Sequence, residues 1–142
     1  MIRSWTIIIL MLLCSFAAVS HTASADEGPL DQIQNLLLSK SFNDKSQAVS
    51  MLAESTHSQS TAILEALMEG ELYYRKSDKQ LLLTKKLDGD YLIYDALTGE
   101  DLGSAQKRTI KKIGTNNAIR KQIRAALASR ELNNPDADIR YQ

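Results

Sequence analysis

The chain has 142 residues, and its 17 acidic side chains balance its 17 basic ones, so the formal net charge is zero. This balance gives the molecule as a whole no attraction to nucleic acid or another polyanion. The single cysteine excludes a framework of internal disulfides, and the 44% hydrophobic content suits one globular domain of ordinary size.

Residues 1–25 have the order of a secretory signal peptide. Arg3 precedes an apolar run over residues 5–19, and the small residues at 23–25 fit a cleavage pattern. The run is short for a bilayer span. We therefore predict an exported protein whose mature chain begins at Asp26 and has one net negative charge, since Arg3 is lost. An uncleaved anchor is the alternative.

Three short helices are predicted over residues 29–70. The segments PLDQIQNLLLSK, NDKSQAVSMLAES and STAILEALMEG place apolar residues at helical spacing. Asn43 or Asp44 is expected to cap the second helix, and Gly70 to end the third. Short helices joined by short polar turns are typical of antiparallel helix pairs.

The spacing of apolar residues changes at residue 71, from a helical pattern to one typical of strands. ELYYRK, KQLLLTKK and YLIYDAL are rich in strand formers, and Asp88-Gly89 is a strong hairpin signal. EDLG follows a further turn. We predict an antiparallel meander of three or four strands near residues 71–103. The leucine run at 81–83 also fits a buried helix, but its short length between turns favours a strand.

Helix is expected to return after the meander. SAQKRTIKKI is predicted to form a short helix, and TNNAIRKQIRAALASREL a long one that Asn116 or Asn117 caps. Residues 133–142 have the pattern of a further helix start, with Asn134 as the cap and Pro135 in the first turn. The expected class is therefore α+β, mainly helical, with one domain over residues 26–132.

The sequence offers little for catalysis. His57 is the one histidine of the mature chain, and no partner for a nucleophilic site accompanies it. The mature chain has no cysteine, because Cys14 is lost with the signal, and one histidine does not make a zinc site. The DGD segment at 88–90 lacks calcium-loop spacing. We predict no catalytic residue, metal or cofactor. Four tyrosines cluster in the strands, either as half-buried packing residues or as a ligand platform, and packing is the commoner role (Tyr73, Tyr74, Tyr91, Tyr94).

Charge is unevenly distributed. Residues 88–101 hold five acids and no base, and residues 102–130 hold eight bases and no acid. One interpretation is a solvated helical face that pairs partly with the acidic stretch. The other is a surface that docks an acidic partner or an anionic membrane. Nucleic acid is an improbable partner for an exported protein. The candidate contact residues are Lys111, Lys112, Arg120, Lys121 and Arg124.

Three segments in this order resemble a known family: EALMEGELYYRKSDKQLLL, YDALTGEDLG and IKKIGTNNAIRKQIRAAL. Together they are similar to the N-terminal extracytoplasmic region of the permease subunit of bacterial urea ABC transporters, in the branched-chain amino acid permease group. Its Leu-Tyr-x-Arg-Lys, Asp-Ala-Leu-Thr-Gly and Lys-Lys-Ile-x-x-Asn-Asn segments are matched at 72–76, 95–99 and 111–117.

The resemblance implies HEAT-like antiparallel helices, a periplasmic location or the periplasmic face of the inner membrane, and contact with the substrate-binding protein and the rest of the permease. No run of 18 apolar residues follows the signal, so it also implies a fragment that cannot itself form a transport path. We expect a non-enzymatic structural or partner-contacting domain. The alternative is a free-standing exported interaction module that uses its basic helix.

Overall fold

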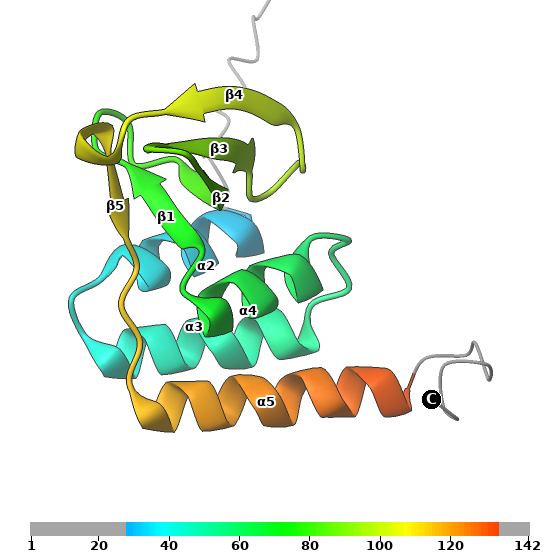
Figure 1. Ribbon diagram of the computed structural model, residues 1–142. Coiled ribbons are helices and arrows are strands. Elements are labelled where there is room, and N and C mark those ends of the chain that lie inside the picture. The colour runs from blue at the N-terminus through cyan, green and yellow to red at the C-terminus, as the bar shows by residue number, and fades with distance from the viewer. Residues whose placement is uncertain (1–27, 134–142) are drawn as a thin grey trace, which may run out of the picture.

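The computed structural model describes residues 28–133, and the predictions for residues 1–25 and for the segment beyond 133 lie outside them. The described chain is built of four helices and a five-stranded antiparallel sheet that lies on one side of them (Figure 1). The α+β class is confirmed. None of the helices in residues 28–133 has the length and apolar content needed to cross a bilayer.

Local sequence signals set the ends of the helices. Ser41 caps α3 by accepting a hydrogen bond from the Asp44 N–H, so the prediction of Asn43 or Asp44 as the cap was wrong. Gly70 ends α4 at φ 77°, as predicted, and the Asn116 side chain caps α5, which settles the choice between Asn116 and Asn117. The helices are α2 (Pro29–Leu38), α3 (Phe42–Glu54), α4 (Ser60–Glu69) and α5 (Asn117–Leu132).

The sheet has the strand order β4-β3-β2-β1-β5. The predicted hairpin forms between β2 and β3, where Gly89 turns the chain at φ 94°. The leucine run at 81–83 is strand, which settles the alternative left open by its pattern. The strands are β1 (Leu72–Arg75), β2 (Leu81–Leu87), β3 (Asp90–Asp95), β4 (Asp101–Ala105) and β5 (Ile110–Lys112).

The helix expected over residues 104–113 does not form. β4 continues to Ala105, the 3-10 turn η1 (Lys107–Thr109) follows, and the chain then pairs as β5 with β1. The Lys76 N–H donates to Thr109 O and the Ile113 N–H to Leu72 O. β-branched threonine and isoleucine suit a strand, and pairing satisfies backbone groups along one edge of β1. The sheet therefore extends to Lys112, beyond the predicted limit near residue 103.

The two faces of the sheet carry separate apolar clusters. One face packs on the helices, where Leu72 and Leu81 join a core that includes Leu37, Leu64 and Leu67. The other face has a smaller cluster of Leu82, Ile93 and Ile110 with Tyr73 and Tyr91 around it. Alternation along the strands assigns successive side chains to opposite faces.

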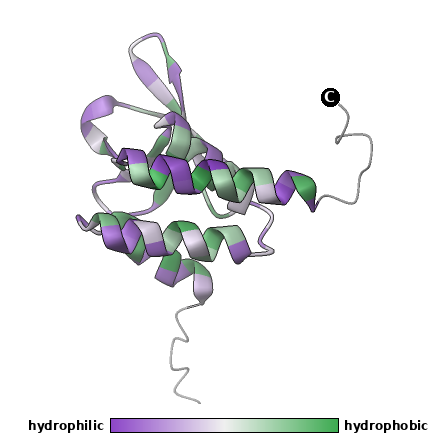
Figure 2. Cartoon of the chain, turned by 90° about the horizontal axis from the view of Figure 1, so that it is seen from below, coloured by the Kyte–Doolittle hydropathy of each residue, from purple (hydrophilic) through white to green (hydrophobic). Residues whose placement is uncertain are grey.

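α5 closes the helical layer. Ile119 and Ile123 are buried, and α5 lies beside α3 when the molecule is seen from below (Figure 2). α3 contacts α2, α4 and α5, so it occupies the middle of the layer. The link from β5 to α5 passes the start of α3, where the Lys45 Nζ donates to Gly114 O at 3.0 Å. This contact fixes β5 and the first turn of α5 relative to α3.

Candidate functional site: a basic strip on β5 and α5

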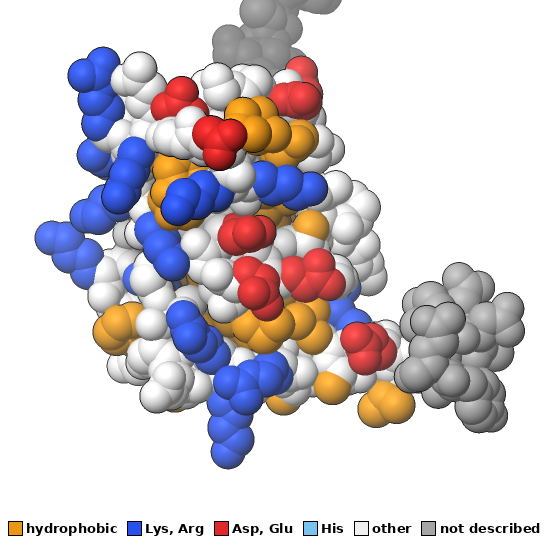
Figure 3. Space-filling model, viewed as in Figure 1, with side chains coloured by type: hydrophobic (Ala, Val, Ile, Leu, Met, Phe, Trp, Pro, Cys, Tyr) orange, Lys and Arg blue, Asp and Glu red, His pale blue; other side chains and the backbone are white. Residues whose placement is uncertain are grey.

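The five basic residues predicted from the sequence occupy one continuous part of the chain and are all exposed. Two lie on β5 and three on the first half of α5; we call Lys111, Lys112, Arg120, Lys121 and Arg124 the basic strip. Lys and Arg side chains gather along the left edge and the lower part of the face in Figure 3, over β5 and α5. Arg120 and Arg124 lie one helical turn apart, on the same side of α5.

The basic strip is not neutralised by acids. Among residues 28–133 the one ion pair within 4.0 Å joins Arg75 to Asp78. The prediction that the acidic stretch at 88–101 pairs partly with these bases was therefore wrong. The physical reason is the strand order, because that stretch forms β3, the following turn and the start of β4, and the strands β2 and β1 separate β3 from β5.

Two of the five acids in that stretch, Asp95 and Asp101, make local hydrogen bonds instead. Asp95 Oδ1 accepts hydrogen bonds from the Leu97 and Thr98 N–H groups, and its Oδ2 accepts from the Gln80 amide at 2.6 Å. Asp101 accepts from the Gly103 N–H at 2.8 Å. Carboxylates that stabilise turns in this way have a local role and need no basic partner.

Individual strip residues differ in their surroundings. The Lys112 ammonium lies beside Gly70 at the C-terminal end of α4, where a positive charge is favourable. The Arg120 Nε donates to Thr115 Oγ1 at 3.3 Å, a long hydrogen bond. Within the described part of the chain, Lys121 and Arg124 make no side-chain hydrogen bond. Lys121 and Arg124 are thus available to a partner.

An aromatic residue lies beside the strip. Phe42, at the start of α3, has 47% of its surface exposed, and its ring centroid is 5.3 Å from Lys45 Nζ. Burial lowers the pKa of Lys45 from 10.5, and the nearby charge of Lys111 lowers it further. Lys45 therefore links the Phe42 ring to the segment between β5 and α5, through its hydrogen bond to Gly114 O. The helical pattern of α3 gave no sign of this, since position 42 lies on the same stripe as Val49 and Leu52.

Arg130, in the same run of bases, has a different role. Its Nη2 donates to the carbonyl oxygens of Leu52 and Ser55, at the end of α3, and its Nη1 to Thr61 Oγ1 at 3.2 Å. A cation there provides the donor for Ser55 O, adds a second donor to Leu52 O, and complements the helix dipole. Arg130 joins α5 to α3 and α4 and is not part of the strip.

The other residues singled out in the sequence have packing or turn contacts. His57 Nδ1 accepts a hydrogen bond from the Gln59 N–H, just before α4. The tyrosines are half-buried, and the Tyr73 and Tyr91 rings lie 5.3 Å apart at a 45° tilt. Burial, and then a hydrogen bond with Tyr91, raises the pKa of Tyr73 to about 12. Residues 28–133 hold no cluster of three or more potential metal ligands from His, Cys, Asp and Glu.

Comparisons with protein-family models, with curated proteins and with solved structures found no match for this chain. The basic strip is therefore interpreted from its own geometry and charge.

Proposed function

We propose that this chain is a non-enzymatic interaction domain that binds an acidic surface of a partner protein through the basic strip. The observation that supports the proposal is the exposure of all five bases of the strip together with the absence, within the described chain, of any acid paired with them. Exposed charges of one sign steer a complementary surface and set its orientation more than they add raw affinity.

The placement of these charges on α5 costs the fold a little. The first turn of α5 has no acidic residue, and Arg120 and Lys121 follow directly on it. Positive charge near a helix N-terminus opposes the helix dipole, by up to about 1 kcal/mol for each exposed group, and the effect falls off within about one turn, so it concerns these two residues and not Arg124. Residues that oppose the helix dipole and make no contact that stabilises the fold are candidates for a binding role. Phe42 adds an exposed aromatic side chain of the kind that anchors protein interfaces.

The resemblance in sequence provides the setting that we propose. The chain would be the extracytoplasmic N-terminal region of a urea ABC transporter permease subunit, at the periplasmic face of the membrane. Its acidic partner would then be the substrate-binding protein or another part of the permease. Three ordered segments, at 72–76, 95–99 and 111–117, support this part of the proposal. A free-standing exported module would use the same strip in the same way.

Binding of a labelled oligoglutamate peptide to the purified protein tests the proposed role of the strip. We expect saturable binding that Arg120→Gln/Arg124→Gln weakens about fivefold, from two exposed charge contacts of about 0.5 kcal/mol each. The matched control is Lys85→Gln/Lys86→Gln, which removes two exposed lysines from β2 and leaves the strip intact. This control is expected to bind within twofold of the parent.

Two outcomes would contradict the proposal. Equal weakening in both double variants would mean that the peptide senses overall charge and not the strip. Tight binding to vesicles that contain phosphatidylglycerol, combined with no saturable binding of the peptide, would assign the strip to a membrane surface instead.

A further inference from the structure

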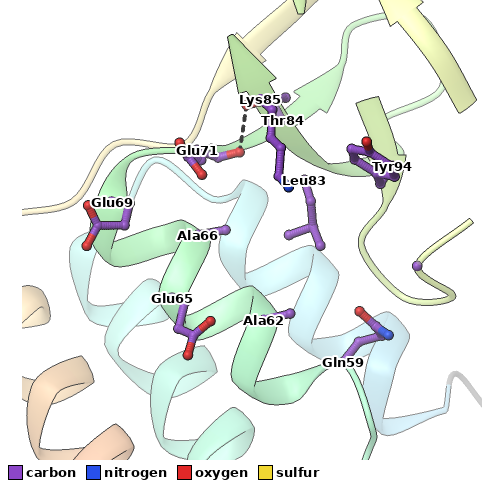
Figure 4. Close-up of a pocket in the computed structure, with 11 residues that line it drawn as sticks. Gln59, Ala62, Glu65, Ala66, Glu69, Glu71, Leu83, Thr84, Lys85 and Tyr94 are labelled. Atoms are coloured by element: carbon purple, nitrogen blue, oxygen red, sulfur yellow. Dashed lines mark hydrogen bonds between the residues drawn. The ribbon is translucent and has the colours of Figure 1, made fainter. Parts of the chain in front are cut away.

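A groove with a mainly acidic lining, in contrast to the basic strip, lies between α4 and the β2–β3 hairpin (Figure 4). Its volume is about 440 Å³, which is within the range of binding clefts in proteins. Ala62, Ala66 and Leu83 form an apolar floor, and Gln59 and Glu69 lie toward its two ends. Between those two residues the helix rises roughly 15 Å, at about 1.5 Å per residue.

The groove exists because the helices cover only part of the sheet face above them. Leu72 and Leu81 are fully covered by the helical layer. Farther along β2, Leu83 is half-buried, and Leu87, which shares this face by strand alternation, is 51% exposed. The far half of the hairpin therefore extends past α4 and leaves an apolar sheet surface without a partner among the described residues.

The rim of the groove is mainly acidic. Glu65 and Glu69 lie one turn apart on α4, and Glu71 directly precedes β1. Lys85 is the one base that lines the groove, so three acidic residues and one basic residue surround it. None of the four is in an ion pair within the described chain. Acidic side chains gather in the middle of the face in Figure 3, to the right of the basic side chains along its edge.

We propose that this groove docks a basic amphipathic segment of a partner protein. Its apolar side packs on Ala62, Ala66 and Leu83, and its Lys or Arg side chains reach Glu65 and Glu69. Long basic side chains suit the site because their aliphatic stems cover apolar surface while the charged ends meet the carboxylates. About ten helical residues match the length of the groove. This inference is independent of the proposed role of the basic strip, which has the opposite charge and selects a different chemistry.

A labelled helical peptide of leucine and lysine, with the leucines on one face, is the probe. We expect the parent protein to bind it, and Glu65→Gln/Glu69→Gln to bind it at least about fivefold more weakly. The matched control is Glu54→Gln/Glu131→Gln, which removes two exposed acids that do not line the groove. This control should bind within twofold of the parent.

A second variant tests whether the shape of the groove contributes to peptide binding separately from its charge. Ala62→Phe keeps every carboxylate but fills the floor, so we expect it to weaken binding by at least about fivefold while thermal unfolding stays cooperative. A peptide of the same composition, with the leucines scattered around the helix, should also bind at least about fivefold more weakly. Amide shifts on titration should centre on Ala62, Leu83 and Tyr94.

The proposal is overturned if the scattered peptide binds as tightly as the amphipathic one, or if the Glu54/Glu131 control loses as much affinity as the groove variant. Amide shifts confined to other elements would also overturn it. The basic strip is tested separately, because Arg120→Gln/Arg124→Gln should leave binding of the basic peptide undiminished. Failure in the groove and failure of the proposed function are therefore distinguishable.

Discussion

The two ends of α5 use arginine in different ways. Near its C-terminus, Arg130 satisfies two carbonyl oxygens at the end of α3 and the hydroxyl of Thr61. In its first half, Arg120 makes one long hydrogen bond and Arg124 none within the described residues. The sequence places all three in one basic run, yet only the C-terminal member has a clear structural role. Charge composition alone therefore does not separate residues that hold the fold from residues that are free to bind.

The largest effect is expected at the structural end. Arg130→Ala removes the side-chain donor to Leu52 O and Ser55 O. Leu52 O keeps the hydrogen bond from the Ser55 N–H, so Ser55 O is the carbonyl left without a donor, at a cost of about 1–3 kcal/mol. We predict that the free energy of unfolding falls by about 1–3 kcal/mol in denaturant titration. Arg124→Ala on the same helix is the control, with an expected change within about 0.5 kcal/mol. Equal losses in the two variants would remove the distinction between the two ends.

The cap of α5 is expected to have an intermediate effect. The Asn116 side chain accepts a hydrogen bond from the Ile119 N–H at 2.9 Å. Asn116→Ala should lower the free energy of unfolding by about 1 kcal/mol, because a helix N–H loses its acceptor. Asn116→Asp keeps the acceptor and adds a favourable charge for the dipole, so its stability should match or exceed that of the parent. A loss in the aspartate variant would argue against the cap.

Replacing a strip residue is expected to raise the stability of the protein, whereas the two preceding substitutions to alanine lower it. Arg120→Glu replaces an unfavourable charge near the start of α5 with a favourable one, and we predict a gain of up to about 0.5 kcal/mol in thermal or chemical unfolding. The same variant should lose affinity for the oligoglutamate peptide. Stability and binding that fall together would indicate that Arg120 is needed for the fold.

The smallest effect is a pH dependence at Lys45, beside the strip. Burial and the charge of Lys111 lower the pKa of Lys45 from 10.5 in the folded state. Between the lowered pKa and 10.5 the unfolded state binds more protons, so this residue makes stability rise with pH in that window. Lys45→Met should remove that rise in the difference between the two stability profiles. Parallel profiles would show that Lys45 titrates alike in both states.

Much of the fold follows from local signals in the sequence. The turn at Asp88-Gly89, the glycine at position 70 and the Asn116 cap each require a particular backbone geometry, and each is found where predicted. The segment at 104–113 was assigned wrongly because its structure depends on pairing with other strands, with β3 at its start and with the distant edge of β1 near its end. Pairing across the sheet outweighs a weak helical period, and no local pattern reports it.

The basic residues of the candidate site could be identified from the sequence, but whether acidic residues pair with them could not. The run of bases identifies the strip, but whether acids neutralise it depends on the strand order, which places β2 and β1 between β3 and β5. The role of Arg130 depends on the packing of α5 against the end of α3. The exposure of Phe42 depends on its place at the very start of its helix. None of these can be inferred from residue spacing alone.

The most direct test is to change all five strip residues to glutamine and to measure unfolding and binding on the same protein. The account predicts a free energy of unfolding within about 1 kcal/mol of the parent, because exposed charges of this kind contribute little to stability. It also predicts that saturable binding of the oligoglutamate peptide is lost. A fall in stability of more than about 2 kcal/mol, or binding equal to that of the parent, would contradict the claim that the fold does not need the strip and that the strip binds an acidic partner.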